Sequence, residues 1–285
     1  MNIEITEKSL LMIFLLEPCN FTCDHCVRED EPMEAGYKLS WQQLRQCLKD
    51  CQDLNSVSWI HFSGGEPTLW SEDGHDLAEL LIEISQAGFN PGFTTNGSYF
   101  IDFDQCYNFF AKYSESAHNP IRLYLSIDNF HQNYDPHTGR AASLDNVLTS
   151  QRKLPGNRGK MIDIQVAVTV SKHNKSLLPE EMVEYYRSAG VSFHFNPLKP
   201  RGKAKSMRNL CPDLDSVNPA DLGAYRRFHL LKHNGIQKMI SEAASIVLIA
   251  DKYYVSFDSC DDFAGQWQKI SPLGKLSDEI ILAYS

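Results

Sequence analysis

The chain lacks a hydrophobic run long enough to cross a membrane. Its N-terminal apolar run covers seven residues, Leu10 to Leu16, whereas a membrane-spanning helix needs about 20. The run leads into Glu17-Pro18-Cys19 and not into a small-residue cleavage site, so no secretory signal is expected. We therefore expect a cytoplasmic protein with no membrane partner.

An excess of positive charge is lacking as well. The 285 residues carry a formal net charge of -9 at pH 7, which gives no general attraction to nucleic acid or to an anionic surface. We therefore expect no nucleic-acid partner, and any basic binding site has to be local. One basic run exists, with five bases and no acid within ten residues: Lys199, Arg201, Lys203, Lys205 and Arg208.

Eight cysteines are present, but without a secretory context they do not predict a disulfide framework. Three of them, Cys19, Cys23 and Cys26, fall within eight residues, directly after the apolar run. Three thiolates on one loop can turn toward one point and hold an iron–sulfur cluster, which leaves one iron without a protein ligand. The alternative is a structural zinc site. His25 lies between two of the thiols and is poorly placed to complete its tetrahedron, so zinc would need a ligand from elsewhere.

Apolar runs and helical periodicities alternate along the first 200 residues. The apolar runs predict strands at 10–16, 57–62, 91–95, 121–127, 162–170 and 191–198. Helical spacing and capping residues predict helices at 40–53, 76–86, 104–114, 143–153 and 179–188. This alternation predicts an α/β fold with a parallel sheet, in the form of a partial (β/α)6 TIM-like barrel.

The pattern changes near residue 200. Beyond it we expect a helix at 220–233, a hairpin formed by 245–250 and 252–257, and a short helix at 277–283. We therefore predict a barrel over residues 1–200 and a small C-terminal extension over 201–285.

A second candidate site, Ser63-Gly64-Gly65-Glu66-Pro67, follows the second predicted strand. Two glycines at a strand end let a ligand approach the backbone closely, and turned backbone groups can hold a charged small molecule. Because the loops after parallel barrel strands meet at one end, this turn and the cysteine loop are expected together. An ordinary turn is the alternative interpretation of Gly-Gly alone.

The spacing CxxxCxxC, followed one strand later by Gly-Gly-Glu-Pro, resembles the radical S-adenosylmethionine (radical SAM) superfamily. The resemblance implies a [4Fe-4S] cluster on the three cysteines and S-adenosylmethionine (SAM) beside it. It implies the following SAM-binding residues: Gly64, Gly65, Glu66 and Pro67 at the methionine amino group, Ser126 and Asp128 at the ribose, Arg140 at the carboxylate, and His25 and Leu198 at the adenine. A turn cap is the alternative for Asp128, and an ordinary surface arginine for Arg140.

The resemblance also implies an enzyme that cleaves SAM reductively to a 5'-deoxyadenosyl radical, which abstracts hydrogen from a substrate. An external one-electron reductant of the flavodoxin or ferredoxin type would supply the electron. Residues 201–285 faintly resemble the SPASM or twitch extension of peptide-modifying members. With only Cys211 and Cys260 there, we expect a degenerate remnant without a cluster.

The substrate expected from that resemblance is a ribosomally made peptide or protein. One alternative is a nucleotide or other phosphorylated small molecule, held by the basic run. Another is a non-catalytic, metal-stabilised binding module. The remaining thiols, Cys47, Cys51 and Cys106, are expected in the core as small apolar groups.

Overall fold

The structure is a computed structural model of the 285-residue chain. It describes residues 9–26, 35–52, 57–128, 139–171, 184, 186–198, 202–211, 244–249, 252–257 and 267–270. The structural statements below concern these residues.

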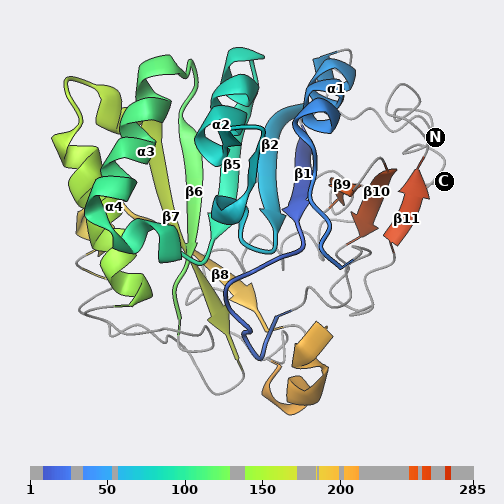
Figure 1. The fold of residues 1–285 in the computed structure, drawn as a ribbon. Coiled ribbons are helices and arrows are strands. Elements are labelled where there is room, and N and C mark those ends of the chain that lie inside the picture. Colours follow the sequence, from blue (N-terminus) through green and yellow to red (C-terminus); the bar gives the residue numbers. More distant parts are fainter. Residues whose placement is uncertain are drawn as a thin grey trace, which may run out of the picture.

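Nine strands form one sheet in the order β11-β10-β9-β1-β2-β5-β6-β7-β8. Six of them are parallel neighbours, β1 (Ser9–Leu16), β2 (Val57–Gly64), β5 (Asn90–Thr95), β6 (Ile121–Ser126), β7 (Ile162–Val170) and β8 (Ser192–Pro197). Figure 1 shows the four helices on one face of the sheet, α1 (Trp41–Gln52), α2 (Leu77–Gln86), α3 (Phe103–Ser116) and α4 (Arg140–Lys153). The predicted α/β fold with six parallel strands is confirmed, and the described strands form an open sheet.

Side-chain caps explain where the helices begin. Ser40 and Gln43 form a reciprocal capping box before α1, with the Gln43 N–H donating to Ser40 Oγ over 3.1 Å and the Ser40 N–H to Gln43 Oε1 over 2.8 Å. Asp76 caps α2 by accepting from the Glu79 N–H. Helix α4 begins at Arg140, three residues before its predicted start, so Arg140 belongs to the helix and not to the preceding loop.

The core lies between the sheet and the helices. Register places Ile13, Phe62, Phe93, Leu123 and Ile164 in one row across five strands, and each is at most 4% exposed. The predicted core cysteines Cys47, Cys51 and Cys106 are all buried in the same core. Burial raises the pKa of the Cys106 thiol to about 12, so this thiol stays protonated and unreactive.

The other face of the sheet carries a polar network that the strand pattern did not predict. Arg122 Nε donates to Asp163 Oδ2 over 2.7 Å, and its guanidinium lies 4.2 Å from the Trp59 ring centroid. His61 Nε2 lies 2.8 Å from Thr94 Oγ1. Burial, and secondarily the charge of Arg122, lower the pKa of His61 to about 3. The imidazole is therefore neutral at physiological pH.

The C-terminal strands continue the same sheet. The predicted hairpin is present as β9 (Ala244–Ile249) and β10 (Lys252–Phe257), and β9 runs parallel to β1. A strand that we did not predict, β11 (Trp267–Ile270), pairs antiparallel with β10. The predicted helices at 220–233 and 277–283, and most of that at 179–188, lie outside the described residues. The boundary near residue 200 stays a prediction.

Four short 3-10 segments and a small hairpin complete the described elements. The 3-10 segments are η2 (Pro67–Leu69), η3 (Ser98–Ile101), η4 (Arg158–Met161) and η5 (Gly202–Leu210). The hairpin consists of β3 (Ser71–Glu72) and β4 (His75–Asp76), and it follows the Gly-Gly-Glu-Pro turn. None of the helices in the described ranges has the length and apolar character needed to span a bilayer.

Candidate SAM and cluster site

The cysteine loop leaves the carboxyl end of β1 and is the blue loop at the lower end of the sheet in Figure 1. Cys19, Cys23 and Cys26 are half-buried there. Within the described ranges, no three His, Cys, Asp or Glu side chains are gathered as ligands of one metal ion. The structure thus brings the three thiols onto one short loop without converging them on a common point.

Two polar side chains from other elements reach this loop. Asn96 Nδ2 lies 3.8 Å from Cys19 Sγ, and Arg140 Nη2 lies 3.6 Å from Cys23 Sγ. N–H groups directed at sulfur are the contacts that surround anionic sulfur ligands in iron–sulfur sites. The three thiols, with these N–H groups beside two of them, are therefore the kind and number of ligands that fit a cluster with three protein ligands.

The Gly-Gly turn lies directly against the start of the cysteine loop. The Gly65 N–H donates to Leu16 O over 2.7 Å, and the Glu66 N–H donates to Pro18 O over 3.0 Å. A Cβ on Gly65 would lie 2.0 Å from Pro18 O. Gly64 has a φ of 109°, a conformation that suits glycine. The absence of a side chain at these two positions therefore allows two loops of the protein itself to pack closely.

Glu66 is buried beneath the turn with donors on both carboxylate oxygens. Oε1 accepts from the Thr68 N–H over 3.1 Å, from Thr68 Oγ1 over 2.7 Å and from Thr95 Oγ1 over 2.7 Å, while Oε2 accepts from the Asn96 N–H over 2.7 Å. Burial raises its pKa, and these hydrogen bonds oppose that effect. The side chain joins the end of β2 to the end of β5.

Asn96 extends this connection to the cysteine loop. Its Nδ2 donates to Asn20 Oδ1 over 2.8 Å, in addition to its contact with Cys19. A continuous path of hydrogen bonds therefore links Glu66, Asn96 and the cysteine loop. Asn96 lies in the turn Thr95-Asn96-Gly97 at the end of β5, so this turn anchors the cysteine loop.

Arg140 is 1% exposed, so the alternative of an ordinary surface arginine is wrong. Its Nη1 donates to Ser126 O over 3.0 Å, and its guanidinium lies 4.8 Å from the Phe21 ring centroid. Burial lowers the pKa of Arg140, while the charges of Cys23, Asp128 and Glu66 oppose the shift. Arg140 therefore connects the end of β6 to the cysteine loop.

Asp128 is fully buried two residues beyond β6, where Oδ2 accepts from the Thr169 N–H over 2.5 Å. It thereby joins the ends of β6 and β7. Pro67 and Leu198 are buried, and His25 is half-buried on the loop. The SAM-binding roles of all these residues stay predictions.

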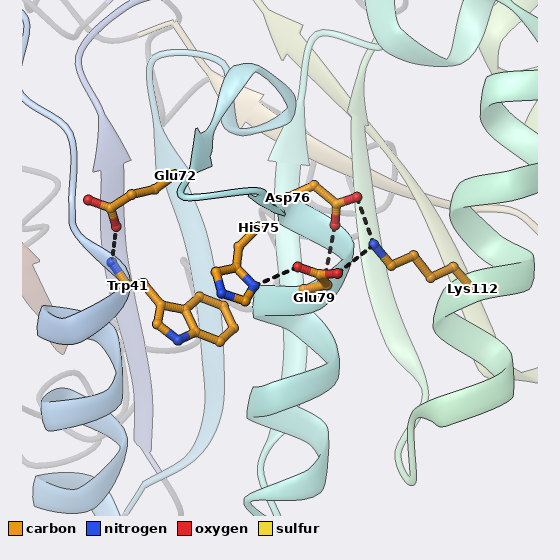
Figure 2. A network of polar contacts seen from close by, with 6 residues as sticks. All are labelled: Trp41, Glu72, His75, Asp76, Glu79 and Lys112. Atoms are coloured by element: carbon orange, nitrogen blue, oxygen red, sulfur yellow. Dashed lines mark hydrogen bonds and ion pairs between the residues drawn. The ribbon is translucent and has the colours of Figure 1, made fainter.

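A second network holds the β3–β4 hairpin behind the turn (Figure 2). Glu72 accepts from the Trp41 N–H at the start of α1. The Trp41 and His75 rings stack with centroids 4.1 Å apart and an interplanar angle of 3°. His75 Nδ1 lies 2.8 Å from Glu79 Oε2, and Lys112 Nζ from α3 bonds Glu79 Oε1 over 2.9 Å. The hairpin is thus fastened to three helices. The hydrophobic periodicity of the sequence could not predict these contacts, because they join side chains from different elements.

Comparison with known proteins gives a family match over the barrel. The profile of the Radical SAM superfamily matches residues 15–164. The GTP 3',8-cyclase of Campylobacter fetus subsp. fetus is 28% identical over 142 residues, covering 48% of this chain and 40% of that protein. YydG of Bacillus subtilis, named for peptide biosynthesis, is 25% identical over 162 residues, covering 57% and 47%. The Fe-coproporphyrin III synthase of Methanosarcina barkeri is 25% identical over 198 residues, covering 69% and 46%.

Two solved structures share the fold. Streptococcus suis SuiB bound to the precursor peptide SuiA has a TM-score of 0.55 and 16% identity, covering 83% of this chain and 51% of SuiB. Native anSMEcpe with bound AdoMet and Cp18Cys peptide has a TM-score of 0.56 and 15% identity, covering 96% of this chain and 80% of that protein. The match to the curated relatives spans less than half of their own length.

Proposed function

Because the chain belongs to the radical SAM superfamily, whose enzymes use a [4Fe-4S] cluster and SAM, we propose that it cleaves SAM reductively and uses the resulting radical to abstract hydrogen from a peptide. The observation that carries the proposal is the meeting of the three-cysteine loop and the Gly-Gly-Glu-Pro turn at the carboxyl ends of β1 and β2. The sequence predicted the two motifs at the same end of the barrel, and hydrogen bonds join them directly there.

Cys19, Cys23 and Cys26 would hold the cluster, which supplies one-electron chemistry at the sulfonium of SAM. The chain itself contributes positioning. The Glu66–Asn96 path fixes the loop from β5, and Arg140 fixes it from β6. In the proposed complex, Arg140 carries the positive charge for the SAM carboxylate, and the end of β6 at Ser126 and Asp128 carries the ribose contacts.

A ribosomally made peptide or protein is the substrate that we propose. The hairpin of β9 and β10 supports the expected resemblance to the C-terminal extension of the peptide-modifying members. YydG is named for peptide biosynthesis, and the SuiB and anSMEcpe structures contain peptides. The GTP 3',8-cyclase match keeps a nucleotide as the second candidate.

Anaerobic reconstitution with iron and sulfide, followed by reduction and chromatography for 5'-deoxyadenosine, tests the chemistry. We expect wild type to bind about four iron atoms per chain and to form the product. Cys23→Ala should lose the cluster and the product together. Cys106→Ala is the matched control, because Cys106 is buried in α3 away from the loop, and it should retain both.

Elemental analysis decides between this enzyme and a metal-stabilised binding module. Stoichiometric zinc in protein purified without oxygen, with no iron or labile sulfide after reconstitution, would establish the binding module. For the substrate, 5'-deoxyadenosine formation is compared with a candidate precursor peptide and with GTP. Stimulation by GTP alone would replace the peptide proposal with the nucleotide one.

A further inference from the structure

The described part of the basic run after β8 is folded and not a loose linker. Residues 202–210 form η5, with Gly202 and Ala204 buried. Lys203 is half-buried, whereas Lys205 and Arg208 are exposed. The segment therefore packs through its small residues and presents charge to solvent. The chain as a whole has a net charge of -9, so η5 is a local region of positive charge.

This segment lies against the cysteine loop. The Lys203 N–H donates to Cys26 O over 3.0 Å, although the two residues are far apart in the sequence. Figure 1 shows the orange-gold η5 next to the blue loop, at the carboxyl end of the parallel strands. The exposed bases thus flank the residues that would carry the cluster. In the described part of this loop, residues 17–26, one acid is exposed, Asp24.

From this placement we propose that η5 is the docking surface for a small acidic one-electron carrier protein of the flavodoxin or ferredoxin type. The inference rests on the proposed radical chemistry, which consumes one electron per SAM cleaved. In the transfer, the reduced carrier loses one electron and the cluster on the cysteine loop gains it, with no bond made or broken. Opposite charges on two proteins speed and orient their encounter.

Exposure favours a protein partner over a phosphorylated small molecule. A small ligand is recognised by groups that converge in a concave site, but the charged side chains of Lys205 and Arg208 are exposed while the uncharged Ala204 is buried. An exposed, charged segment beside the proposed cluster site suits the rim of a transient protein complex.

The test measures how fast reduced flavodoxin is oxidised by the reconstituted protein in a stopped-flow spectrometer, at low and high salt. The double variant Lys205→Glu/Arg208→Glu is compared with Arg152→Glu/Lys160→Glu. The control pair has the same charge change, is exposed, and lies at the opposite end of the parallel strands, before β7. We expect the η5 variant to react at least about tenfold more slowly than the control at 50 mM NaCl. The difference in rate between the two variants should disappear near 500 mM NaCl, where charges are screened.

Reduction by dithionite separates this inference from the proposed function. We expect dithionite to reduce the cluster equally in wild type and both variants. If wild type forms no reducible cluster even with dithionite, the proposed function fails as well. If all clusters are reduced by dithionite but the η5 variant reacts with flavodoxin within twofold of the control, only the docking surface is overturned.

A second outcome would also overturn the proposal that η5 is a docking surface. If wild type binds GTP in a calorimetric titration, and the η5 variant loses that binding but keeps its rate with flavodoxin, the segment serves a phosphorylated ligand. Iron content and circular dichroism check that the variants fold. The milder pair Lys205→Gln/Arg208→Gln should fall between wild type and the charge reversal.

Discussion

Glu66 illustrates how the structure changes the meaning of a motif residue. The sequence marked it as part of Gly-Gly-Glu-Pro, with a contact to SAM as the implied role. In the structure its carboxylate is 1% exposed and accepts four hydrogen bonds from three residues of neighbouring loops. Its first contribution is therefore to hold the ends of β2 and β5 in place, which positions the cysteine loop through Asn96.

Replacing Glu66 with glutamine should destabilise the fold and weaken cluster retention. The amide group brings its own N–H donors toward groups that already donate, so we expect a loss of about 1–3 kcal/mol in the free energy of unfolding. Urea denaturation measures it. Glu79→Gln, which affects a partly exposed ion pair on α2, is the control and should cost about 1 kcal/mol or less. Equal losses in the two variants would show that Glu66 is not a structural anchor.

His61 gives the protein a predictable sensitivity to acid. Its folded pKa is lowered to about 3, whereas an unfolded histidine titrates near 6.5. Below that pH the unfolded chain takes up a proton that the folded chain refuses, so stability falls as pH falls. From pH 7.5 to 5.5 the loss from this group should be about 1 kcal/mol. Urea midpoints for wild type and His61→Gln measure it. The variant should lose less over this interval, and an identical pH dependence would contradict the assignment.

At the scale of elements, the contact between the two site loops depends on Gly65. A methyl group there would collide with Pro18 O at 2.0 Å, so the loops would have to separate. We expect Gly65→Ala to cost about 2 kcal/mol or more of stability and to reduce SAM affinity, measured by calorimetry on the reconstituted protein. Gly74→Ala has no atom within 4 Å of the new Cβ. With a φ of 84° there, it should cost only about 1 kcal/mol. If SAM binds equally to both variants, the loop contact is irrelevant to the site.

The strands were predictable because their apolar runs are buried against the helices, as the row from Ile13 to Ile164 shows. The polar network on the other face of the sheet was not predictable, because Arg122 and Asp163 pair across two strands and lie 41 residues apart in the sequence. The start of α4 was also missed. Gly139, its cap residue, makes no side-chain cap bond that a sequence pattern could reveal.

The site was predictable in its motifs and not in its connections. The two motifs follow strand ends, and a parallel sheet brings such ends together. The burial of Arg140 and the anchoring role of Asn96 depend on contacts from different loops. Such contacts leave no local sequence pattern.

At the scale of the whole molecule, the C-terminal strands complete the sheet. Strand β9 pairs with β1 from Leu11 to Ile13, so it covers an edge that would otherwise be open and apolar. Truncation after residue 211 should expose this edge and cause aggregation, measured by light scattering. Removing only residues 271–285 keeps every described strand and should leave the protein monodisperse. A monodisperse, folded 1–211 fragment would contradict the contribution of β9.

In the proposed function, the cysteine loop carries a cluster to which SAM binds. Electron paramagnetic resonance of the anaerobically reconstituted, reduced protein, recorded before and after SAM is added, tests it most directly. We predict the signal of a reduced [4Fe-4S] cluster that changes shape on addition of SAM, because SAM takes the iron that the three cysteines leave open. Cys23→Ala should lack the signal. A wild-type spectrum that SAM leaves unchanged, from protein with a full complement of iron, would contradict the account.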